Sequence, residues 1–580
     1  MKVAVIGSGL AGLTTAYLLQ KEGVEVWLIE KSNKLGFHSQ SVEIPLSSLS
    51  NEHEKSSRRS RSEKDVEEKW VVDVPMRGFQ GGYYPLLLSL YDHLKIPLEI
   101  SNYKFSFSSS SPKSTYFIHS GSSGLSIPSL PSRAYHNIFN LISNIYTFIG
   151  VAICYSFLVA LSLLGYHNLL PSSLSTFNQR RRDRTQEHQL TLKEFTTIIS
   201  AFLTHPFTIP IINYEVWTPL GEIFESFFIS NILVPIFSSV GTMTIKDCYS
   251  LPVSIVLEYI HLTLGTDHYH LGKGFTASSI ADLLAKSVRD QGEGYVRLCT
   301  EITGLEYQDG VKIKMKDLSR TDEGQVGAEQ EILVDRVIIA TPASVAKLLL
   351  EGLESSLKEA GQVKECRRVG GMRAALGKIS YRESIVITHR DITILPSPRD
   401  RRDLNFLLPN LNPSLPPTSS TETLAIPYFT PAPDTIYTQA TQIILPPKRL
   451  RRKGRRETMV LQTTNPAGPI DPRKVLSVSK LERALPLKQP HRILPHLRSS
   501  TLDSCVYIVG SYAYPGIPLL EGCVGSAKKA VETILNDEFE QRTGFVRQPK
   551  KPLGGVDWDV GKGGWVQTGW RWRWFEGTWI

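Results

Sequence analysis

The sequence predicts an α/β fold, α+β over the whole chain, that starts with a strand, a tight turn, a helix and a second strand. The first observation is a short apolar run over residues 3–6, typical of a strand buried on both faces. The second is a GxGxxG pattern over residues 7–12, followed by a helical pattern to residue 21. The third is another apolar run over residues 24–29, which predicts a second strand beside the first.

The glycine turn and the acidic residue after the second strand together indicate a dinucleotide site. Gly7, Gly9 and Gly12 allow a tight turn, a close approach to a pyrophosphate and close helix–strand packing. The helix N-terminus offers unpaired N–H groups to the phosphates. Glu30 lies where a carboxylate accepts hydrogen bonds from ribose hydroxyls. A purely structural turn is the alternative. The predicted loop contacts are Gly7, Ser8, Gly9, Leu10, Ala11 and Gly12.

The residues after Glu30 resemble one family of flavin proteins. Gly36, Phe37, His38 and Ser39 follow the acid. The segment resembles the FAD-containing amine oxidase and phytoene desaturase superfamily, and most closely its branch of predicted NAD/FAD-binding proteins, which read Gly-Gly-His-Ser/Ala. Phe37 replaces the second glycine. The resemblance implies FAD as cofactor, with Lys31, Gly36, His38 and Ser39 beside it; for His38 a surface loop position is the alternative.

Further resemblance to this superfamily comes late in the chain. Val296, or Leu298 as the alternative, falls about where the superfamily contacts the adenine through its backbone, and Gly510 falls in a turn that holds the ribityl or phosphate groups. Glu521 and Gly522 open a helix whose N-terminus points at the flavin pyrimidine in the family. The resemblance therefore adds Val296, Gly510, Glu521 and Gly522 to the expected cofactor contacts.

Residues 376–396 carry the most specific resemblance to the narrower branch. Tyr381, His389, Asp391 and Pro396 match its pattern. His389 and Asp391 alternate on an expected strand, so they would share a face and could shuttle a proton. A hydrogen-bonded structural pair is the alternative. We expect His389 to be the proton-handling residue, with Asp391 fixing its tautomer and Tyr381 as the next candidate.

Bulk composition limits the classes of partner. A chain of 580 residues is too long for one core. Much of the net charge of +9 lies in short runs at residues 180–184, 399–403 and 448–456, which have no interleaved aromatic residues. No nucleic acid is therefore expected; solvated loops, or contacts with acidic lipid headgroups, explain these runs better. The six scattered cysteines predict reduced thiols and no metal site.

A charge-free apolar run over residues 141–164 is long enough to cross a bilayer as a helix of about 20 residues or more. It could span a membrane, insert without crossing, or be a buried helix of the substrate domain. A single span would put two flavin-fold segments on opposite sides, so we expect insertion without crossing. A nucleotide-binding strand that starts at residue 2 leaves no room for a cleavable signal. We expect the cytoplasmic side and association with a membrane surface.

The resemblance implies a glutathione-reductase-type Rossmann FAD domain in three pieces, with a partly helical substrate domain inserted. The expected FAD pieces are residues 1–110, 265–350 and 496–538, and the expected substrate pieces are residues 111–264 and 351–495. We expect a disordered insertion at residues 46–69, loops at 412–423 and 448–456, and a Trp-rich tail at 539–580.

The function implied is that of an FAD-dependent oxidoreductase. It would take a hydride from a lipophilic substrate, such as an acyl chain, a polyene or an amine, onto flavin N5. A flavin-binding protein without turnover and a true amine oxidase are the alternatives. No nucleophile, metal cluster or zinc spacing competes with them. The sequence alone does not distinguish among substrates, electron acceptors or oligomeric states.

Overall fold

The structure is a computed structural model. It describes residues 1–38, 41–45, 69–75, 78–110, 113–121, 127–166, 190–204, 207–209, 214–216, 219–272, 274–319, 329–409, 436–446, 459–547 and 551–560. The expected loops at 412–423 and 448–456 lie outside the described residues, as do Ser39, nearly all of the insertion at 46–69 and the last 20 residues of the tail.

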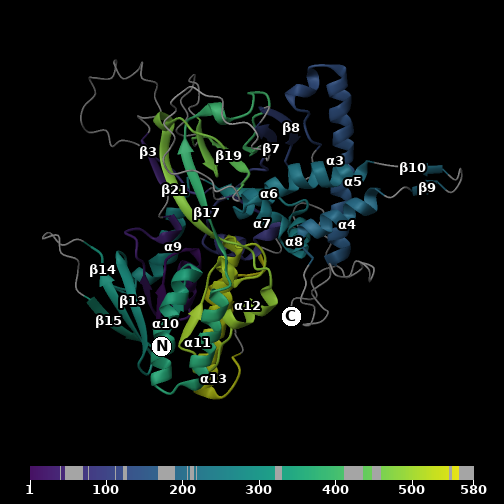
Figure 1. The fold of residues 1–580 in the computed structure, drawn as a ribbon. Coiled ribbons are helices and arrows are strands. Elements are labelled where there is room, and N and C mark those ends of the chain that lie inside the picture. Colours follow the sequence, from purple (N-terminus) through teal and green to yellow (C-terminus); the bar gives the residue numbers. More distant parts are fainter. Residues whose placement is uncertain are drawn as a thin grey trace, which may run out of the picture.

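A five-stranded parallel sheet forms the lower part of the molecule (Figure 1). Its strand order is β12-β2-β1-β16-β22. The strands are β1 (Lys2–Ile6), β2 (Glu25–Ile29), β12 (Val296–Arg297), β16 (Arg336–Ile339) and β22 (Val506–Ile508). Three distant parts of the chain thus build one parallel sheet, which confirms the predicted α/β fold class.

Both faces of this sheet are buried, because successive side chains of each strand point to opposite faces. Val3 and Val5 pack with the first layer, which contains α1 (Leu10–Lys21), α9 (Ala277–Arg289) and α13 (Leu520–Thr543). Ala4 and Ile6 pack with the second layer. That layer contains β13 (Thr300–Tyr307), β14 (Val311–Asp317), β15 (Glu329–Val334), α10 (Ala343–Glu359), α11 (Val363–Leu376) and α12 (Pro490–Leu497).

A seven-stranded sheet lies in the upper part of Figure 1, with strand order β21-β17-β20-β19-β18-β7-β8. The strands are β7 (Phe105–Ser110), β8 (Lys113–His119), β17 (Tyr381–His389), β18 (Leu404–Leu408), β19 (Gln439–Ile444), β20 (Val460–Thr464) and β21 (Val475–Ala484). β7 pairs with β18 in parallel, and the other pairs are antiparallel. This sheet therefore joins residues before and after the helical region.

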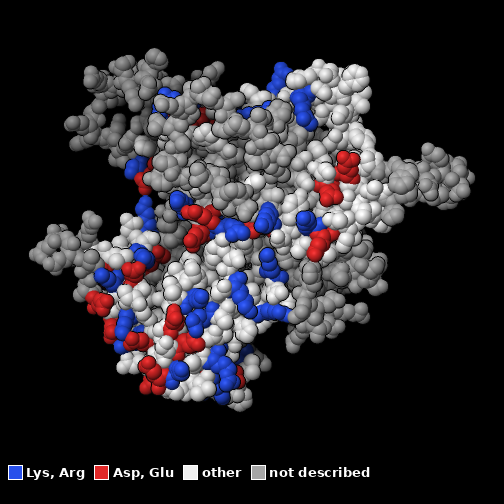
Figure 2. Space-filling view, in the orientation of Figure 1, with Lys and Arg blue, Asp and Glu red and all other residues white. Residues whose placement is uncertain are grey.

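The helical region lies beside this sheet. It contains α3 (Ile138–Tyr166), α4 (Leu192–Thr204), α5 (Leu220–Glu222), the π-helix η8 (Ile223–Leu233), α6 (Val234–Gly241), α7 (Ile245–Tyr249) and α8 (Val253–Thr263). By length and composition, α3 and the run Leu220–Gly241 are each apolar enough to cross a membrane. Figure 2 shows a largely uncharged surface over the region of α3.

The strand pairing keeps both ends of α3 on one body. β8 precedes α3, and β18, which follows it, lies in the same sheet. Thr191, between α3 and α4, pairs with Pro252. A crossing by α3 alone would put these segments on opposite sides of a membrane, so it is incompatible with this sheet.

The other elements connect these layers. They are η1 (Gly36–His38), β3 (Val42–Pro45), β4 (Lys69–Val72), β5 (Gly78–Gln80), η4 (Gly81–Tyr83), α2 (Pro85–His93), β6 (Leu98–Ile100), η6 (Ser132–Tyr135), β9 (Phe207–Ile209), β10 (Tyr214–Val216), β11 (His268–Leu271), η9 (Ile392–Ile394), η11 (Pro472–Lys474), η12 (Ser511–Ala513) and η13 (Leu553–Gly555).

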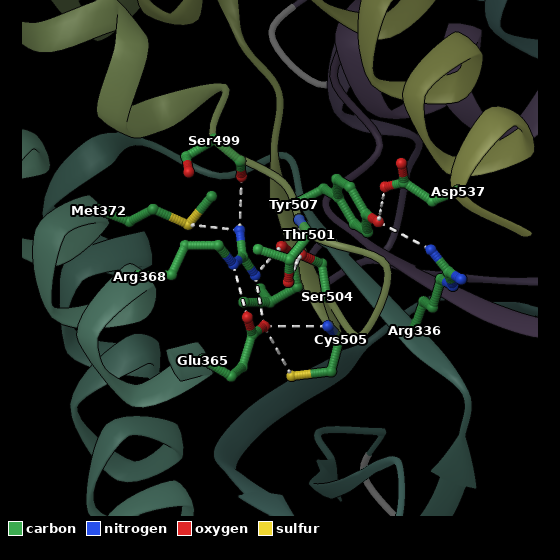
Figure 3. Close-up of polar contacts among 11 residues, drawn as sticks. Arg336, Glu365, Arg368, Met372, Ser499, Thr501, Ser504, Cys505, Tyr507 and Asp537 are labelled. Carbon is green, nitrogen blue, oxygen red and sulfur yellow. Dashed lines mark hydrogen bonds and ion pairs between the residues drawn. The ribbon is translucent and has the colours of Figure 1, made fainter. Parts of the chain in front are cut away.

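A buried ion pair ties α11 to the start of β22 (Figure 3). Arg368 Nε donates to Glu365 Oε2 at 2.6 Å, and Arg368 also donates to the carbonyls of Val506 and Ser499 at 2.8 and 2.7 Å. The backbone N–H of Cys505 donates to Glu365 Oε1 at 3.0 Å. The second layer and the last strand of the parallel sheet are thereby held together.

Candidate dinucleotide site

The glycine turn after β1 has the geometry that a dinucleotide needs. Gly7 has φ +100°, and a Cβ there would lie 2.8 Å from the Ala340 carbonyl oxygen. A Cβ on Gly12 would overlap the Gly7 carbonyl. Gly9 differs, because a Cβ on it would meet nothing within 4 Å. Gly7 and Gly12 are therefore required by the fold itself, whereas Gly9 faces open space at the start of α1.

The N-terminus of α1 is available to an anion. Gly9 is the N-cap residue, and no side chain caps the helix. The first turn of any helix has N–H groups without intrahelical partners, and the helix dipole adds positive charge there. α1 follows β1 directly, so this end lies at the carboxyl edge of the parallel sheet, where ligands bind in open α/β folds.

Glu30 follows β2 directly and bonds to the glycine turn. Its Oε2 accepts from the backbone N–H and the hydroxyl of Ser8, at 2.8 and 2.6 Å, and its Oε1 accepts from the N–H of Ser32 at 2.9 Å. A carboxylate has about four acceptor positions, so one on Oε1 is left for a ribose hydroxyl. The neighbouring Lys31 ammonium is turned to Glu301 in an exposed ion pair.

The segment after Glu30 folds back over the glycine turn. The Gly36 N–H donates to Ser8 Oγ at 2.6 Å, and the Phe37 N–H donates to the Ser8 carbonyl at 3.2 Å. A Cβ on Gly36 would lie 3.2 Å from Glu30 Oε2. The Phe37 side chain is buried in the first layer, so it lies within the core. The structure describes the backbone of His38 and no part of Ser39.

Val296 lies on the edge strand of the parallel sheet. The N–H groups of Leu28 and Glu30 donate to the carbonyls of Tyr295 and Arg297, both at 2.8 Å. Backbone groups alternate in direction along a strand, so the N–H and C=O of Val296 face away from β2. β12 ends the strand order, so these two groups face the free edge, where a planar base could pair with them.

Glu521 lies in the first turn of α13, as the resemblance implies, and its side chain points to α2 (Pro85–His93). Its two carboxyl oxygens accept from the N–H groups of Leu86 and Leu87, both at 3.0 Å, at the start of α2. α2 has no side-chain cap of its own, so Glu521 satisfies these two buried donors. Burial raises the pKa of Glu521 to about 8, although the two N–H groups act in the opposite direction. Its carboxyl group therefore holds α2 in place.

Gly510 and Gly522 are also placed by local packing. The Gly510 N–H donates to Ser526 Oγ at 3.0 Å, and a Cβ on Gly522 would lie 2.8 Å from the Ser511 carbonyl. α13 starts next to them without a side-chain cap and packs against α1. The two long helices of the first layer thus both begin uncapped on the same face of the sheet.

A comparison with family models decides what this unit is. Residues 5–94 match the model of the NAD(P)-binding Rossmann-like domain. This segment is a Rossmann-like domain. The dinucleotide-binding turn predicted from the sequence lies within it, as do Glu30 and α2.

Solved structures are similar to the chain at low identity. One is a triple mutant of putrescine oxidase, with 12% identity, coverage of 92% of this chain and 98% of that chain, and a TM-score of 0.45. A single mutant of the same oxidase has 11% identity, the same coverage and a TM-score of 0.48. An oxidoreductase from Methanosarcina mazei has 15% identity, coverage of 91% and 99%, and a TM-score of 0.47. No curated protein matches the chain.

The three residues predicted to act in proton transfer do not form one cluster. Tyr381 and His389 lie at opposite ends of β17, eight residues apart, which is about 26 Å along an extended strand. Tyr381 is the one nearer the Rossmann-like domain, because its hydroxyl accepts from the Ala343 N–H at 2.7 Å, just beyond β16. Tyr381 and His389 therefore do not share a site.

Asp391 contacts His389 through its backbone N–H, and its carboxylate bonds elsewhere. β17 ends at His389, and Asp391 instead caps η9. Its carboxylate accepts from Lys474 Nζ at 3.0 Å and from the Asp471 N–H at 3.1 Å; burial alone would raise its pKa, but these bonds together outweigh burial and lower it. The Asp391 carboxylate therefore does not orient the imidazole of His389.

His389 is fully buried within a row of polar side chains. Its Nδ1 accepts from the Asp391 N–H at 3.0 Å, so the ring proton lies on Nε2, which donates to Thr463 Oγ1 at 2.8 Å. Thr463 in turn lies 2.9 Å from the Thr441 hydroxyl. Burial lowers the pKa of His389 to about 4, so the ring is neutral at pH 7. This geometry favours a structural role.

Sequence reasoning missed buried tyrosines that join the Rossmann-like segment to other parts of the chain. Tyr83 accepts from the Ile517 N–H at 2.8 Å, and its ring lies 4.9 Å from that of Tyr259. The Tyr512 hydroxyl donates to the Thr341 carbonyl at 2.9 Å, just after β16. Tyr83 and Tyr512 are buried. The positions of Tyr512 and Tyr514, two and four residues after Gly510, were the available signal.

Stability should pass through a maximum near pH 6.5. Burial lowers the pKa values of His119, His268 and His389 to about 4, so the unfolded chain binds more protons between pH 6.5 and 4 and stability falls on acidification. For fully buried His389 this amounts to about 3 kcal/mol. Glu521 acts oppositely: between pH 4.5 and 8 the folded chain holds the extra proton, so stability falls as pH rises.

Urea unfolding at about pH 5, 6.5 and 8 measures both limbs of this profile. Glu521→Gln should flatten the alkaline limb and make the rise in stability between pH 5 and 6.5 steeper, because the variant lacks the opposing titration of Glu521. A wild-type profile that rises steadily up to pH 8 would contradict the assignment.

Proposed function

We propose that this protein is an FAD-dependent oxidoreductase. The observation that carries the proposal is that α1 and α13 pack together in one layer over the parallel sheet and that each begins without a side-chain cap. They come from the two ends of the chain, and each supplies N–H donors and positive dipole charge. The sequence resemblance to the FAD-containing superfamily supports a flavin nucleotide over a nicotinamide one.

The residues present fit FAD. Open space at Gly9 admits a diphosphate against the N-terminus of α1, and the remaining acceptor position on Glu30 suits a ribose hydroxyl. The backbone N–H and C=O of Val296, which face away from β2, suit an adenine base. Bound FAD would supply a hydride acceptor at its N5 atom. The chain's own part is to bind the cofactor, to orient the substrate and to exclude water.

A lipophilic substrate is the class that the surroundings suit best. The helical region beside the seven-stranded sheet is strongly apolar, and the ring of Tyr259 in α8 contacts that of Tyr83, which lies in the Rossmann-like segment. An acyl chain, a polyene or an amine would fit such surroundings.

We propose further that the protein works on the cytoplasmic side, at a membrane surface. A true amine oxidase and a flavin-binding protein without turnover are the alternatives.

The proposal is tested by anaerobic reduction of the flavin with candidate lipids, polyenes and amines. Bleaching of the flavin absorbance by one class identifies the substrate class. Bleaching with amines alone would favour the amine oxidase. A flavin that none of them reduces would favour the protein without turnover.

His389→Ala separates the catalytic prediction from a structural role. Because His389 is buried and bonded to Thr463, we expect lower stability, by about 1–3 kcal/mol, and flavin reduction within a few-fold of wild type. A decrease of about 10²-fold or more in the reduction rate, with FAD still bound, would instead show proton handling by His389. Thr463→Val is the matched control, since it removes the same hydrogen bond and leaves the imidazole in place.

A further inference from the structure

An apolar stripe runs along the outer face of α3. The members recur at helical spacing of three and four residues, and each exposes a large share of its side chain. They are Ile138, Phe139, Ile142, Ile145, Tyr146, Ile149 and Ile153. Phe139 is 79% exposed and Ile142 is 58% exposed. Exposed apolar residues are normally scattered singly, so a continuous apolar stripe indicates a surface that binds another protein or a membrane.

The opposite face of α3 is part of the core. Cys154 and Leu158 are buried there, and Phe157 stacks on Phe202 of α4 at 6.3 Å between ring centroids. Phe202 is itself 63% exposed, so it extends the apolar surface beyond α3. The stripe covers 16 residues, which is about 24 Å of helix. α3 is therefore held by the molecule on one side and open along the other.

Basic residues surround the start of this helix. Ser132, in η6 just before α3, donates from its N–H and its hydroxyl to Asp400 at 2.8 and 2.6 Å. These bonds hold the turn at residues 396–403 against the start of α3. We call the resulting cluster the basic rim. It consists of Lys113, Arg133, Arg399, Arg401 and Arg402, and Asp400 and Asp403 are the acidic residues within it.

Figure 2 shows Lys and Arg side chains at the edge of the uncharged surface. An exposed tyrosine, Tyr135, lies between the rim and the stripe with 68% of its surface accessible. Tyrosine is enriched where a membrane meets water, and basic residues are attracted to anionic headgroups. The order of charge, tyrosine and apolar stripe along one surface is that of a bilayer interface.

We propose that the stripe and the basic rim dock this protein on a bilayer that contains anionic phospholipid. The helix lies in one leaflet, because the sheet that joins β8 to β18 is incompatible with a crossing by α3 alone, and the pairing of Thr191 with Pro252 is incompatible with a return through Leu220–Gly241. A second copy of the chain would bring another positive rim, whereas lipid phosphates supply the opposite charge. This inference deepens the proposed function, because the same membrane would deliver a lipophilic substrate.

Vesicle co-sedimentation of the full chain tests the stripe. Vesicles of phosphatidylcholine with about 30% phosphatidylserine should bind wild-type protein about tenfold or more tightly than phosphatidylcholine alone. The double variant Phe139→Glu, Ile142→Glu should lose binding by about tenfold or more. The control is Leu348→Glu on α10, where the replaced side chain is 68% exposed and far along the chain from α3. It should bind as wild type does.

Charge reversal tests the rim. Arg399→Glu with Arg401→Glu should weaken binding to the anionic vesicles by about tenfold and abolish its dependence on salt. Lys358→Glu with Lys364→Glu, two exposed residues of α10 and α11, is the matched control and should change nothing. Rim or stripe variants that bind as tightly as wild type would overturn the proposal.

Two further readouts distinguish lipid docking from self-association and from flavin binding. Light scattering without lipid should give a monomer; a stable dimer that the stripe variant dissociates would show that a second copy covers the stripe, and would overturn lipid docking. The FAD content is measured on the same samples. Protein that contains FAD but binds no vesicles would refute the docking proposal and leave the flavin proposal intact. Protein that binds vesicles but contains no FAD would refute the flavin proposal and leave docking intact.

Discussion

Replacing Gly9 by valine is expected to abolish FAD binding while the fold remains intact. Gly9 has φ −61°, which any residue adopts, and a Cβ there meets nothing within 4 Å. The side chain would therefore project into the space that the diphosphate needs at the start of α1. We expect affinity for FAD to fall by about 100-fold or more, about 2.7 kcal/mol, with stability changed by less than about 1 kcal/mol.

Two variants frame this prediction. Gly468→Val is the matched control, because a Cβ on Gly468 also meets nothing within 4 Å, and it should keep full FAD affinity. Gly7→Val should behave differently from Gly9→Val, since Gly7 has φ +100° and its Cβ would press on the Ala340 carbonyl, so the fold itself should weaken. Titration of apoprotein with FAD and urea unfolding measure both effects. Unchanged FAD affinity in Gly9→Val would place the cofactor elsewhere.

Replacing Arg368 by methionine is expected to destabilise the protein by about 3–5 kcal/mol. The Glu365 carboxylate would remain buried with only the Cys505 backbone N–H and thiol as partners, and the carbonyls of Val506 and Ser499 would lose their donor (Figure 3). Since β22 and α13 follow this contact in the chain, the C-terminal part of the Rossmann-like sheet should loosen first.

The control for Arg368 is an exposed pair. Lys31→Met breaks the ion pair with Glu301, in which the lysine side chain is 67% exposed, and should cost less than about 1 kcal/mol. The double variant Glu365→Met, Arg368→Met should be less destabilised than Arg368→Met alone, because no unpaired charge is left in the core. Equal losses in the single and double variants would show that the buried charge is not the cause.

The dinucleotide-binding turn and Glu30 were predictable because their structure depends on residues close to them in the sequence. The turn at Gly7–Gly12 and the acid at Glu30 depend on one strand, one helix and the next strand, all within 30 residues. Their geometry follows from the chain's own backbone, since the Gly7 turn permits few other residues. The α/β class followed from the same apolar runs, which alternate between two buried layers in the structure.

The other site residues depend on partners far along the chain. The bonds of the Glu521 side chain were not predictable, because its carboxyl group caps α2, whose N–H groups lie 434 and 435 residues earlier. The pairing of His389 with Asp391 assumed that the strand continued. Asp391 instead ends it, because its carboxylate is taken by η9 and Lys474. Lys474 and the start of α2 lie far along the chain from these two carboxyl groups, so the local pattern does not show them as partners.

The most direct test of the central claim is the absorption spectrum of the purified full-length protein, with the released cofactor identified by chromatography. The account predicts a yellow protein with flavin absorbance that releases FAD on denaturation, and a Gly9→Val variant that is folded and colourless. A folded wild-type protein that binds NAD and neither contains nor takes up FAD would contradict it.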